Sequence, residues 1–159
     1  LIFTVKSIPV GSFIILVLIW VRSAQLSIVI SFLMVFPIFY ENVRKGIEMC
    51  DQQLLEMADV FELSTFTRIR YIYTSSVLPY FQRACSLALG LAWKSGIAAE
   101  VIGLPKFSIG EHLQQAKVYF DTADLFAWTL VIILLSTVLE KLVMALIRML
   151  IKYIETECL

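Results

Sequence analysis

Charged residues are scarce in this chain, and their scarcity limits the classes of protein it can belong to. Only 16% of its 159 residues are charged, 60% are hydrophobic, and the formal net charge is zero. A soluble domain carries about 25% charged and roughly 45–50% apolar residues. Because the excess of apolar side chains has to face lipid, the sequence predicts an integral membrane protein. The neutral charge gives no indication of nucleic-acid binding.

The residues on which enzymes and metal sites depend are equally few. The single histidine, His112, lies in a polar stretch and is interpreted as a surface residue. The three cysteines (Cys50, Cys85 and Cys158) are odd in number and lack metal-ligand spacing, which indicates free thiols. No phosphate-binding loop, serine-hydrolase, zinc-protease or dinucleotide-binding motif is present. We therefore expect no catalytic residue, no metal site and no enzyme activity.

Four stretches are long and apolar enough to be membrane-spanning helices, which need about 20 residues. They run from about 4 to 21, 26 to 44, 79 to 103 and 124 to 151. The predicted fold class is all-α: a polytopic membrane helical bundle of four transmembrane helices, forming one domain over residues 1–159. The chain starts inside an apolar run that lacks the basic region and cleavage site of a signal peptide. We therefore expect it to be a fragment of a longer protein.

The longest polar segment, residues 49–78, separates the second and third apolar stretches. Its first half carries apolar side chains on one helical face, among them Ala58 and Phe61, opposite acidic and amide side chains. Its second half follows Ser64 and Thr65, either of which can cap a helix. We therefore predict two short amphipathic helices joined by a turn and lying along the membrane surface.

A second polar segment, residues 104–123, separates the last two apolar stretches. Ser108 followed by Glu111 fits a capping box that opens a short helix. Basic residues are concentrated on the side of the membrane that holds segment 49–78 and both chain ends. The positive-inside rule places that side in the cytoplasm, so segment 104–123 is predicted to be extracytoplasmic.

The third apolar stretch combines small residues with charge. Alanine or glycine recurs every four residues, at Ala84, Ala88, Ala92 and Gly96. Such a stripe lets helices approach closely in a membrane, so we expect it to pack against another helix. Lys94 and Glu100 lie in the same stretch, and because charge is costly in a bilayer both should face protein or water. Two interpretations stay open: these charges line the path of a small anion, or they are structural charges bonded to another helix.

Segment 49–78 resembles the EAA loop of ABC importer permeases. That pattern is Glu-Ala-Ala, three residues, Gly, nine residues, Ile, one residue and Leu-Pro. Glu56, Ala58 and Ile72 match its first, third and isoleucine positions, whereas Glu62 stands at the glycine and Thr74-Ser75 at the Leu-Pro pair. Glycine adopts a positive φ freely and glutamate does not. Either the turn at this position needs no left-handed residue, or the joint is stiffer.

Other parts of the chain are similar to one subfamily of these permeases, which imports nitrate, sulfonates, taurine and related small molecules. They are Leu78-Pro79, the LALGLAW run, Ala98–Glu100 and Tyr119–Thr122. The resemblance covers essentially the whole chain. It implies a family with six membrane helices, of which this chain would supply the last four.

The resemblance also implies partners. Such permeases work as a pair of membrane subunits, here expected to be two copies of the permease, with cytoplasmic ABC ATPase subunits and an extracytoplasmic substrate-binding protein. ATP is bound by the ATPase, so this chain is expected to need no cofactor. The EAA helices sit in a groove of the ATPase and transmit its closure. The residues expected to make this coupling contact are Glu56, Met57, Ala58, Asp59, Phe61, Glu62 and Arg68.

The sequence thus predicts a multi-pass subunit of the cell membrane that forms the channel of an ATP-driven importer for a small anionic solute. Two alternatives stay open. One is an ABC importer permease for a different solute, for instance a vitamin precursor or an amino acid. The other is a membrane scaffold or channel without an ATPase partner.

Overall fold

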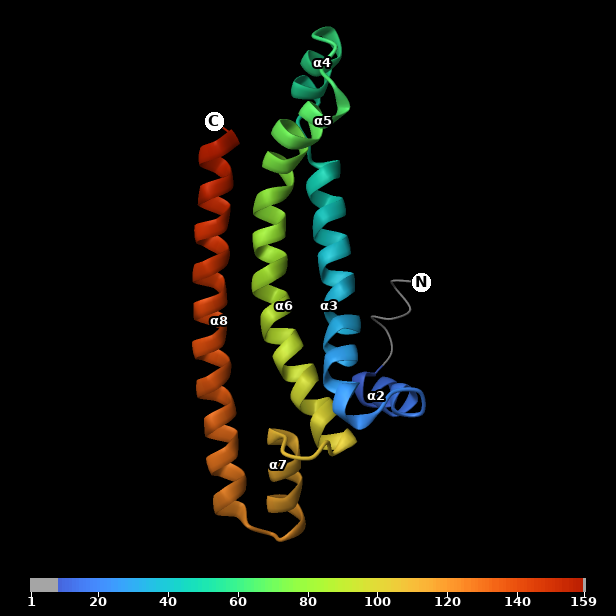
Figure 1. Ribbon diagram of the computed structural model, residues 1–159, viewed down its shortest axis with the longest axis vertical. Coiled ribbons are helices and arrows are strands. Elements are labelled where there is room, and N and C mark those ends of the chain that lie inside the picture. The colour runs from blue at the N-terminus through green and yellow to red at the C-terminus, as the bar shows by residue number, and fades with distance from the viewer. Residues whose placement is uncertain (1–8, 159) are drawn as a thin grey trace. The chain divides into compact units, whose positions relative to one another are not determined.

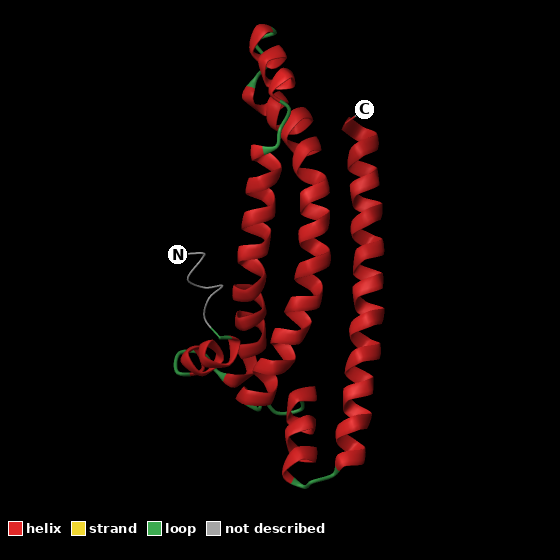
Figure 2. Ribbon diagram, turned by 180° about the vertical axis from the view of Figure 1, so that it is seen from behind, coloured by secondary structure: helices red, strands yellow, loops and turns green. Residues whose placement is uncertain are grey.

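The computed structural model describes the backbone of residues 9–158 and the side chains of residues 9–153. Every regular element in this range is a helix, and no strand occurs in it (Figure 1 and Figure 2). The elements are α2 (Val10–Leu18), α3 (Ser23–Glu48), α4 (Gln52–Val60), α5 (Thr65–Thr67), the π-helix η1 (Arg68–Tyr73), α6 (Thr74–Gly103), α7 (Ile109–Val118) and α8 (Thr122–Cys158). The predicted all-α fold is confirmed.

Three stretches of described helix are long and apolar enough to cross a membrane: Ser23–Glu48, Thr65–Gly103 and Thr122–Tyr153. They contain the last three predicted spans. The first predicted span, 4–21, begins in residues that lie outside the described range, and its described part contains the shorter helix α2. The polytopic helical class therefore fits, while the number of four spans stays a prediction.

The third long helix begins earlier than we expected. Its start was predicted near residue 79, but α6 begins at Thr74 and Pro79 lies inside it. Pro37 likewise lies inside α3, where it is buried. A proline removes one backbone donor from the helix, and neighbouring groups can satisfy the freed carbonyl in a membrane protein. The proline therefore does not mark the start of the helix.

The chain divides into two compact units, each of which contains parts of the long helices. Of the described residues, the first contains 9–37 and 88–140, and the second contains 38–87 and 141–158. The buried apolar core of the first unit is drawn from α2, α3 and α6, and consists of Ile14, Leu26, Ile30 and Ala99.

Small residues bring α3 and α6 close together within the first unit. The Ser31 hydroxyl on α3 donates a hydrogen bond to the Ala92 carbonyl on α6, at 2.9 Å. A Cβ placed on Gly96 would lie 3.0 Å from Ser31 Oγ, and one on Gly103 would lie 2.5 Å from Leu26 Cδ2. Because no larger residue fits at Gly103 without a shift, the face of α6 that carries these residues is closely packed against α3.

Close packing of the same two helices recurs within the second unit. A Cβ on Gly46 of α3 would lie 2.9 Å from the Cα of Val77 on α6. The rings of Phe39 and Phe81 lie 5.4 Å apart between their centroids. Ala84 is fully buried in this unit. The end of α3 and the start of α6 therefore form a firm base for the polar segment that joins them.

The last helix, α8, is apolar and largely uncovered. Several of its side chains are more than half exposed, among them Phe126, Leu130, Leu134, Leu146 and Met149. An exposed apolar helix of this length suits contact with lipid or with another membrane helix.

Candidate functional site in the elbow between α3 and α6

The polar connection between α3 and α6, residues 51–74, is called the elbow below (Figure 1). It begins with a capped helix. Asp51 has an extended backbone, and its carboxylate accepts a hydrogen bond from the Gln53 N–H at 2.9 Å. This is the arrangement of a helix N-cap, which satisfies a backbone donor that the first turn leaves unpaired. Just outside the elbow, the Ser76 hydroxyl donates to Cys50 Sγ at 3.5 Å, which ties this start to α6.

The first helix of the elbow, α4, ends in a Schellman motif. The Leu63 N–H binds the Ala58 carbonyl at 3.0 Å, and the Glu62 N–H binds the Asp59 carbonyl at 3.1 Å. The motif requires a left-handed residue after the C-cap, a position that is usually glycine. Glu62 occupies it with a φ of 47°. Of the two alternatives left open by the sequence, the turn does need a left-handed residue, and a glutamate supplies it.

Arg68 fastens this turn to the end of α4. Its Nη2 donates to the Ala58 carbonyl at 3.1 Å, and its Nε donates to the Leu63 carbonyl at 3.0 Å. Its Nη1 forms an ion pair with the Asp59 carboxylate. The planar guanidinium thus binds carbonyls at a helix end together with a carboxylate, a geometry that lysine cannot reproduce. Arg68 therefore holds the turn through contacts both with α4, before the turn, and with Leu63, after it.

The second half of the elbow starts at a cap and passes into a wider turn. Ser64 Oγ accepts a hydrogen bond from the Thr67 N–H at 3.3 Å, which confirms one of the two predicted caps. The helix then continues as η1 before α6 begins. The sequence did not predict this π-helix. Its one local signal is Thr74, which stands where the resembling family has a leucine and whose hydroxyl binds the Ile69 carbonyl at 2.8 Å.

The predicted coupling residues come together on the elbow but differ in exposure. Ala58 is buried, and its carbonyl accepts a hydrogen bond from the Arg68 guanidinium, which itself is partly covered. The rest of the predicted set is exposed: Glu56, Met57, Asp59, Phe61 and Glu62. Phe66, which the sequence placed on the second helix, is 71% exposed as well. The elbow therefore offers apolar and acidic side chains on a firmly held backbone.

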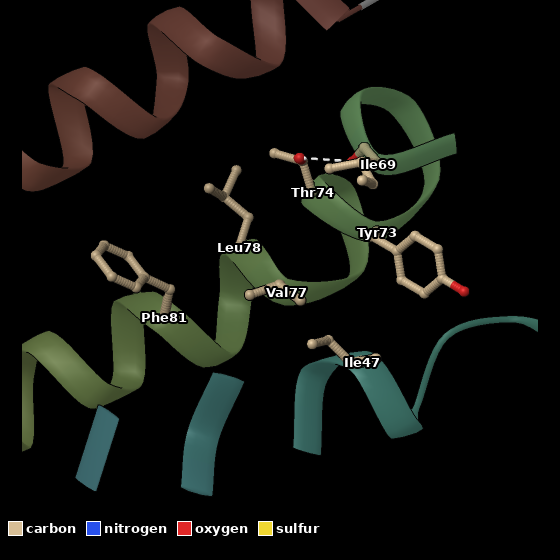
Figure 3. Close-up of a pocket in the computed structure, with 7 residues that line it drawn as sticks. All are labelled: Ile47, Ile69, Tyr73, Thr74, Val77, Leu78 and Phe81. Atoms are coloured by element: carbon tan, nitrogen blue, oxygen red, sulfur yellow. Dashed lines mark hydrogen bonds between the residues drawn. The ribbon is translucent and has the colours of Figure 1, made fainter. Parts of the chain in front are cut away.

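An apolar cavity of about 480 Å³, open to the surface, lies beside the junction of the elbow with the two long helices. Figure 3 shows its lining, with Ile47 of α3 facing Val77 of α6. The lining residues are Ile47, Ile69, Tyr73, Thr74, Val77, Leu78 and Phe81. They offer hardly any polar group, so the cavity has the chemistry of a packing space rather than of a polar-ligand site.

The two predicted path residues lie apart from the elbow, in the first unit. Lys94 is exposed and forms no ion pair with any residue whose side chain is described. Glu100 accepts a hydrogen bond from the Gly110 N–H at 3.2 Å, near the start of α7. A carboxylate at a helix N-terminus is favourable, so Glu100 has a structural partner within the chain.

The segment that contains α7 also forms as a capped helix. Ser108 Oγ accepts from the Glu111 N–H at 3.1 Å, as expected of a capping box. The Glu111 carboxylate reaches back to the Phe107 N–H at 2.6 Å, one residue before the position that the motif predicts. His112, which was interpreted as a surface residue, is exposed and stacks on Trp128 with 4.6 Å between ring centroids.

These features define the class first: an all-helical, polytopic membrane protein in which a firmly capped polar elbow joins two helices of membrane-spanning length. Comparison with known proteins gives the family. The chain belongs to the family described as "Binding-protein-dependent transport system inner membrane component", whose model matches residues 1–155. The resemblance to importer permeases is therefore confirmed at the level of the family, which is one of transport components and not of enzymes.

Individual relatives carry permease names. A protein of Bacillus subtilis (strain 168), provisionally named an aliphatic sulfonates transport permease protein, SsuC, is 28% identical over 118 residues, which is 74% of this chain and 42% of that protein. Proteins of Brucella melitensis biotype 1 and Brucella abortus (strain 2308), provisionally named ABC transporter permease proteins, are each 26% identical over 101 residues, which is 64% of this chain and 41% and 40% of those proteins. The chain thus spans about two fifths of the length of these relatives. No solved structure matches it.

Proposed function

We propose that the chain is part of the membrane channel of an ATP-driven importer, and that its elbow is the docking site for a cytoplasmic ABC ATPase. The observation that carries this proposal is the exposed patch on the elbow. Met57 and Phe61 are 44% and 71% exposed although they are apolar, and Glu56 and Asp59 lie exposed on the same helix turns. Apolar side chains rimmed by charge on a fixed backbone are typical of a protein interface.

The experiment compares two charge reversals in the full-length protein, expressed together with its cognate ATPase and purified in detergent. Glu56→Lys on the elbow is expected to abolish retention of the ATPase and solute uptake. Asp124→Lys, which makes the same kind of change at an exposed residue in the first turn of α8, is expected to leave both unchanged. A full-length protein that retains no ATPase, and whose activity survives Glu56→Lys, would favour a scaffold or a channel without an ATPase partner.

The orientation of the chain is part of the proposal. Segment 49–78 is assigned to the cytoplasm and segment 104–123 to the other side, because basic residues are more frequent on the side of the former. Val60 and Val118 are 80% and 61% exposed, so a cysteine at either place is open to a reagent. In intact cells, a membrane-impermeant maleimide should label V118C and not V60C in a cysteine-free background. The reverse pattern would invert the assignment.

We further propose that the solute is a small anion of the nitrate, sulfonate or taurine class. The exposed Lys94, which forms no ion pair with a described side chain, supports this, as does the sulfonate-transport name of the Bacillus relative. In the complete transporter, a second permease copy and an extracytoplasmic binding protein would complete the path. Lys94→Gln should raise the KM for uptake of a sulfonate about tenfold, because it removes a charged contact to the anion. Uptake of a neutral or cationic solute, with no effect of Lys94→Gln, would show a different cargo.

A further inference from the structure

The helix that leads from the elbow into α6 contains an uncommon wide turn, within the second unit. Residues 68–73 form the π-helix η1, in which the Thr74 N–H binds the Ile69 carbonyl, five residues earlier. An α-helix would pair that N–H with the carbonyl four residues earlier. Short π-turns inside helices are rare, and those that do occur are often found at functional sites. The chain therefore carries one extra residue at the point where the elbow meets the long helix.

A side chain supports the wide turn. The Thr74 hydroxyl donates to the same Ile69 carbonyl at 2.8 Å, so both donors of Thr74 bind one acceptor. A threonine hydroxyl in an α-helix can bind the carbonyl four residues earlier. Thr129 and Thr137 do this in α8, where each hydroxyl lies 2.8 Å from that carbonyl. Thr74 thus differs from the other two in a way that favours the π-form over the α-form.

The cavity of about 480 Å³ adjoins this turn, and Ile69, Tyr73 and Thr74 are part of its lining. In Figure 3 these side chains surround the place where η1 passes into α6. Protein interiors are normally close-packed, and a helix turn enclosed by packed side chains cannot change its winding without displacing them. Beside this turn the space is open, so the turn can rewind with little obstruction.

Rewinding would have a large geometric effect. Loss of the extra residue shifts the helix register by one position, which corresponds to a rotation of about 100° and a rise of about 1.5 Å. Arg68, the first residue of η1, is bound to α4 through Ala58 and Asp59. Since α4 is held to this residue, α4 would move with the start of the turn.

We propose that η1 is a two-state joint, with the π-form seen here and an α-form in another state of the transporter, and that Thr74 is the positioning residue that holds the π-form. The inference rests on the proposed function, because ATPase closure on the elbow supplies the work that rewinds the turn. It concerns residues 68–74, of which only Arg68 belongs to the predicted coupling residues; Met57 and Phe61, the exposed apolar side chains of the docking patch, lie outside this stretch.

The test measures the distance between spin labels on the elbow and on α6. Labels at V60C and L87C, both exposed positions of the second unit, are placed in the full-length transporter with its ATPase in lipid nanodiscs, without the native cysteines. The wild-type background should show a distance that changes when a non-hydrolysable ATP analogue binds. Thr74→Val, which replaces the hydroxyl with a methyl group and keeps the β-branched shape, should shift the nucleotide-free population about fivefold toward the ATP-bound distance. The solute transported per ATP should fall.

Two further variants make the result specific. Thr129→Val removes an ordinary hydroxyl–carbonyl bond in α8 and should change neither distance nor coupling. Leu78→Trp fills the cavity and should restrict the distance change even if Thr74→Val does not fold. One unchanging distance in both nucleotide states, with the ATPase bound and active, overturns the joint and leaves the docking proposal standing. A complex that never forms overturns both.

Discussion

Two connections join the long helices of this chain, and they are held in different ways. The elbow, residues 51–74, links α3 to α6, and the segment with α7, residues 104–121, links α6 to α8. Each contains a short helix with a polar N-cap, and each places non-glycine residues in the left-handed region. These are Glu62 in the elbow and Leu104, Phe107 and Phe120 in the segment with α7.

The difference lies in what each connection is fastened to. The bonds that hold the elbow lie within it, because Arg68 binds the end of α4 across the turn. The helix α7 is fastened to α6, because Gly110 lies against the backbone of Glu100 and donates to its carboxylate. The first arrangement holds the elbow together as one body, which the proposed joint at η1 requires. The second makes a helix that must follow α6.

The largest effect on stability is expected from a change at Gly110, which separates α7 from its contact with α6. A Cβ at this position would lie 2.5 Å from the carbonyl carbon of Glu100 and 2.5 Å from the nitrogen of Val101. Backbone atoms of a helix cannot give way as a flexible side chain can. Gly110→Ala should therefore destabilise the protein by about 3 kcal/mol, at the upper end of the cost of overpacking. Thermal unfolding of the full-length protein in detergent measures this loss.

Gly90→Ala is the matched control for that variant. Gly90 lies inside α6, and a Cβ there would meet nothing within 4 Å. Alanine is favoured over glycine in a helix interior by roughly 0.5–1 kcal/mol, so this variant should be slightly more stable than the wild type. If both variants behave alike, α7 is not seated on α6 in the folded protein.

Removal of the Arg68 side chain should release the elbow while leaving α7 in place. The bonds of this guanidinium to a carboxylate and to helix-end carbonyls are charge-assisted. Arg68→Ala should lower the free energy of opening the elbow by about 2 kcal/mol, which corresponds to cleavage on the order of 30 times faster at Phe61 and Phe66 by chymotrypsin.

Arg44→Ala provides the comparison for the loss of Arg68. Arg44 pairs with Glu48 at 2.7 Å, but 65% and 54% of these side chains are exposed. An exposed pair one helix turn apart contributes about 0.3–0.5 kcal/mol, so cleavage of the elbow should barely change. Equal rates in the wild type and Arg68→Ala would mean that the Schellman turn holds without the arginine.

The sequence predicted what depends on local pattern. The long apolar helices, a cap at Ser64 or Thr65 and a cap at Ser108 follow from residue type and spacing, and the structure contains the helices and the caps at Ser64 and Ser108. The sequence did not predict the early start of α6, because Pro79 suggested that the helix begins there. In the structure the helix begins at Thr74 and continues through Pro79. Proline position alone cannot reveal where neighbouring groups satisfy the freed carbonyl.

Features that depend on contacts between distant residues were not predictable. The contact of Gly110 with Glu100 joins α7 to α6 across the connection between them, and neither residue carries a local signal for it. The sequence predicted Arg68 only as a residue of the coupling contact, because two of its three partners are backbone carbonyls that any sequence offers. The wide turn of η1 had one unusual residue, Thr74, and no periodic pattern.

The smallest effect is expected at Glu62, where the turn of the elbow itself can be examined. A left-handed backbone costs a non-glycine residue about 1–2 kcal/mol, and glycine avoids this cost. Glycine in turn loses roughly 0.5–1 kcal/mol of stability because it has more freedom in the unfolded chain. Glu62→Gly should therefore stabilise the full-length protein by about 0.5–1 kcal/mol in thermal unfolding. Glu56→Gly makes the same change inside α4, where the backbone is right-handed, and should destabilise by about 1 kcal/mol.

Opposite signs for these two variants would show that the strain at residue 62 is present in the full-length protein. A loss of stability in both would mean that residue 62 leaves the left-handed region there, and that the Schellman motif is not retained. Retention of the ATPase adds a second measurement. If Glu62→Gly gains stability but loses coupling, the glutamate stiffens a turn that glycine would let bend. The strain at residue 62 is then part of how the elbow transmits force.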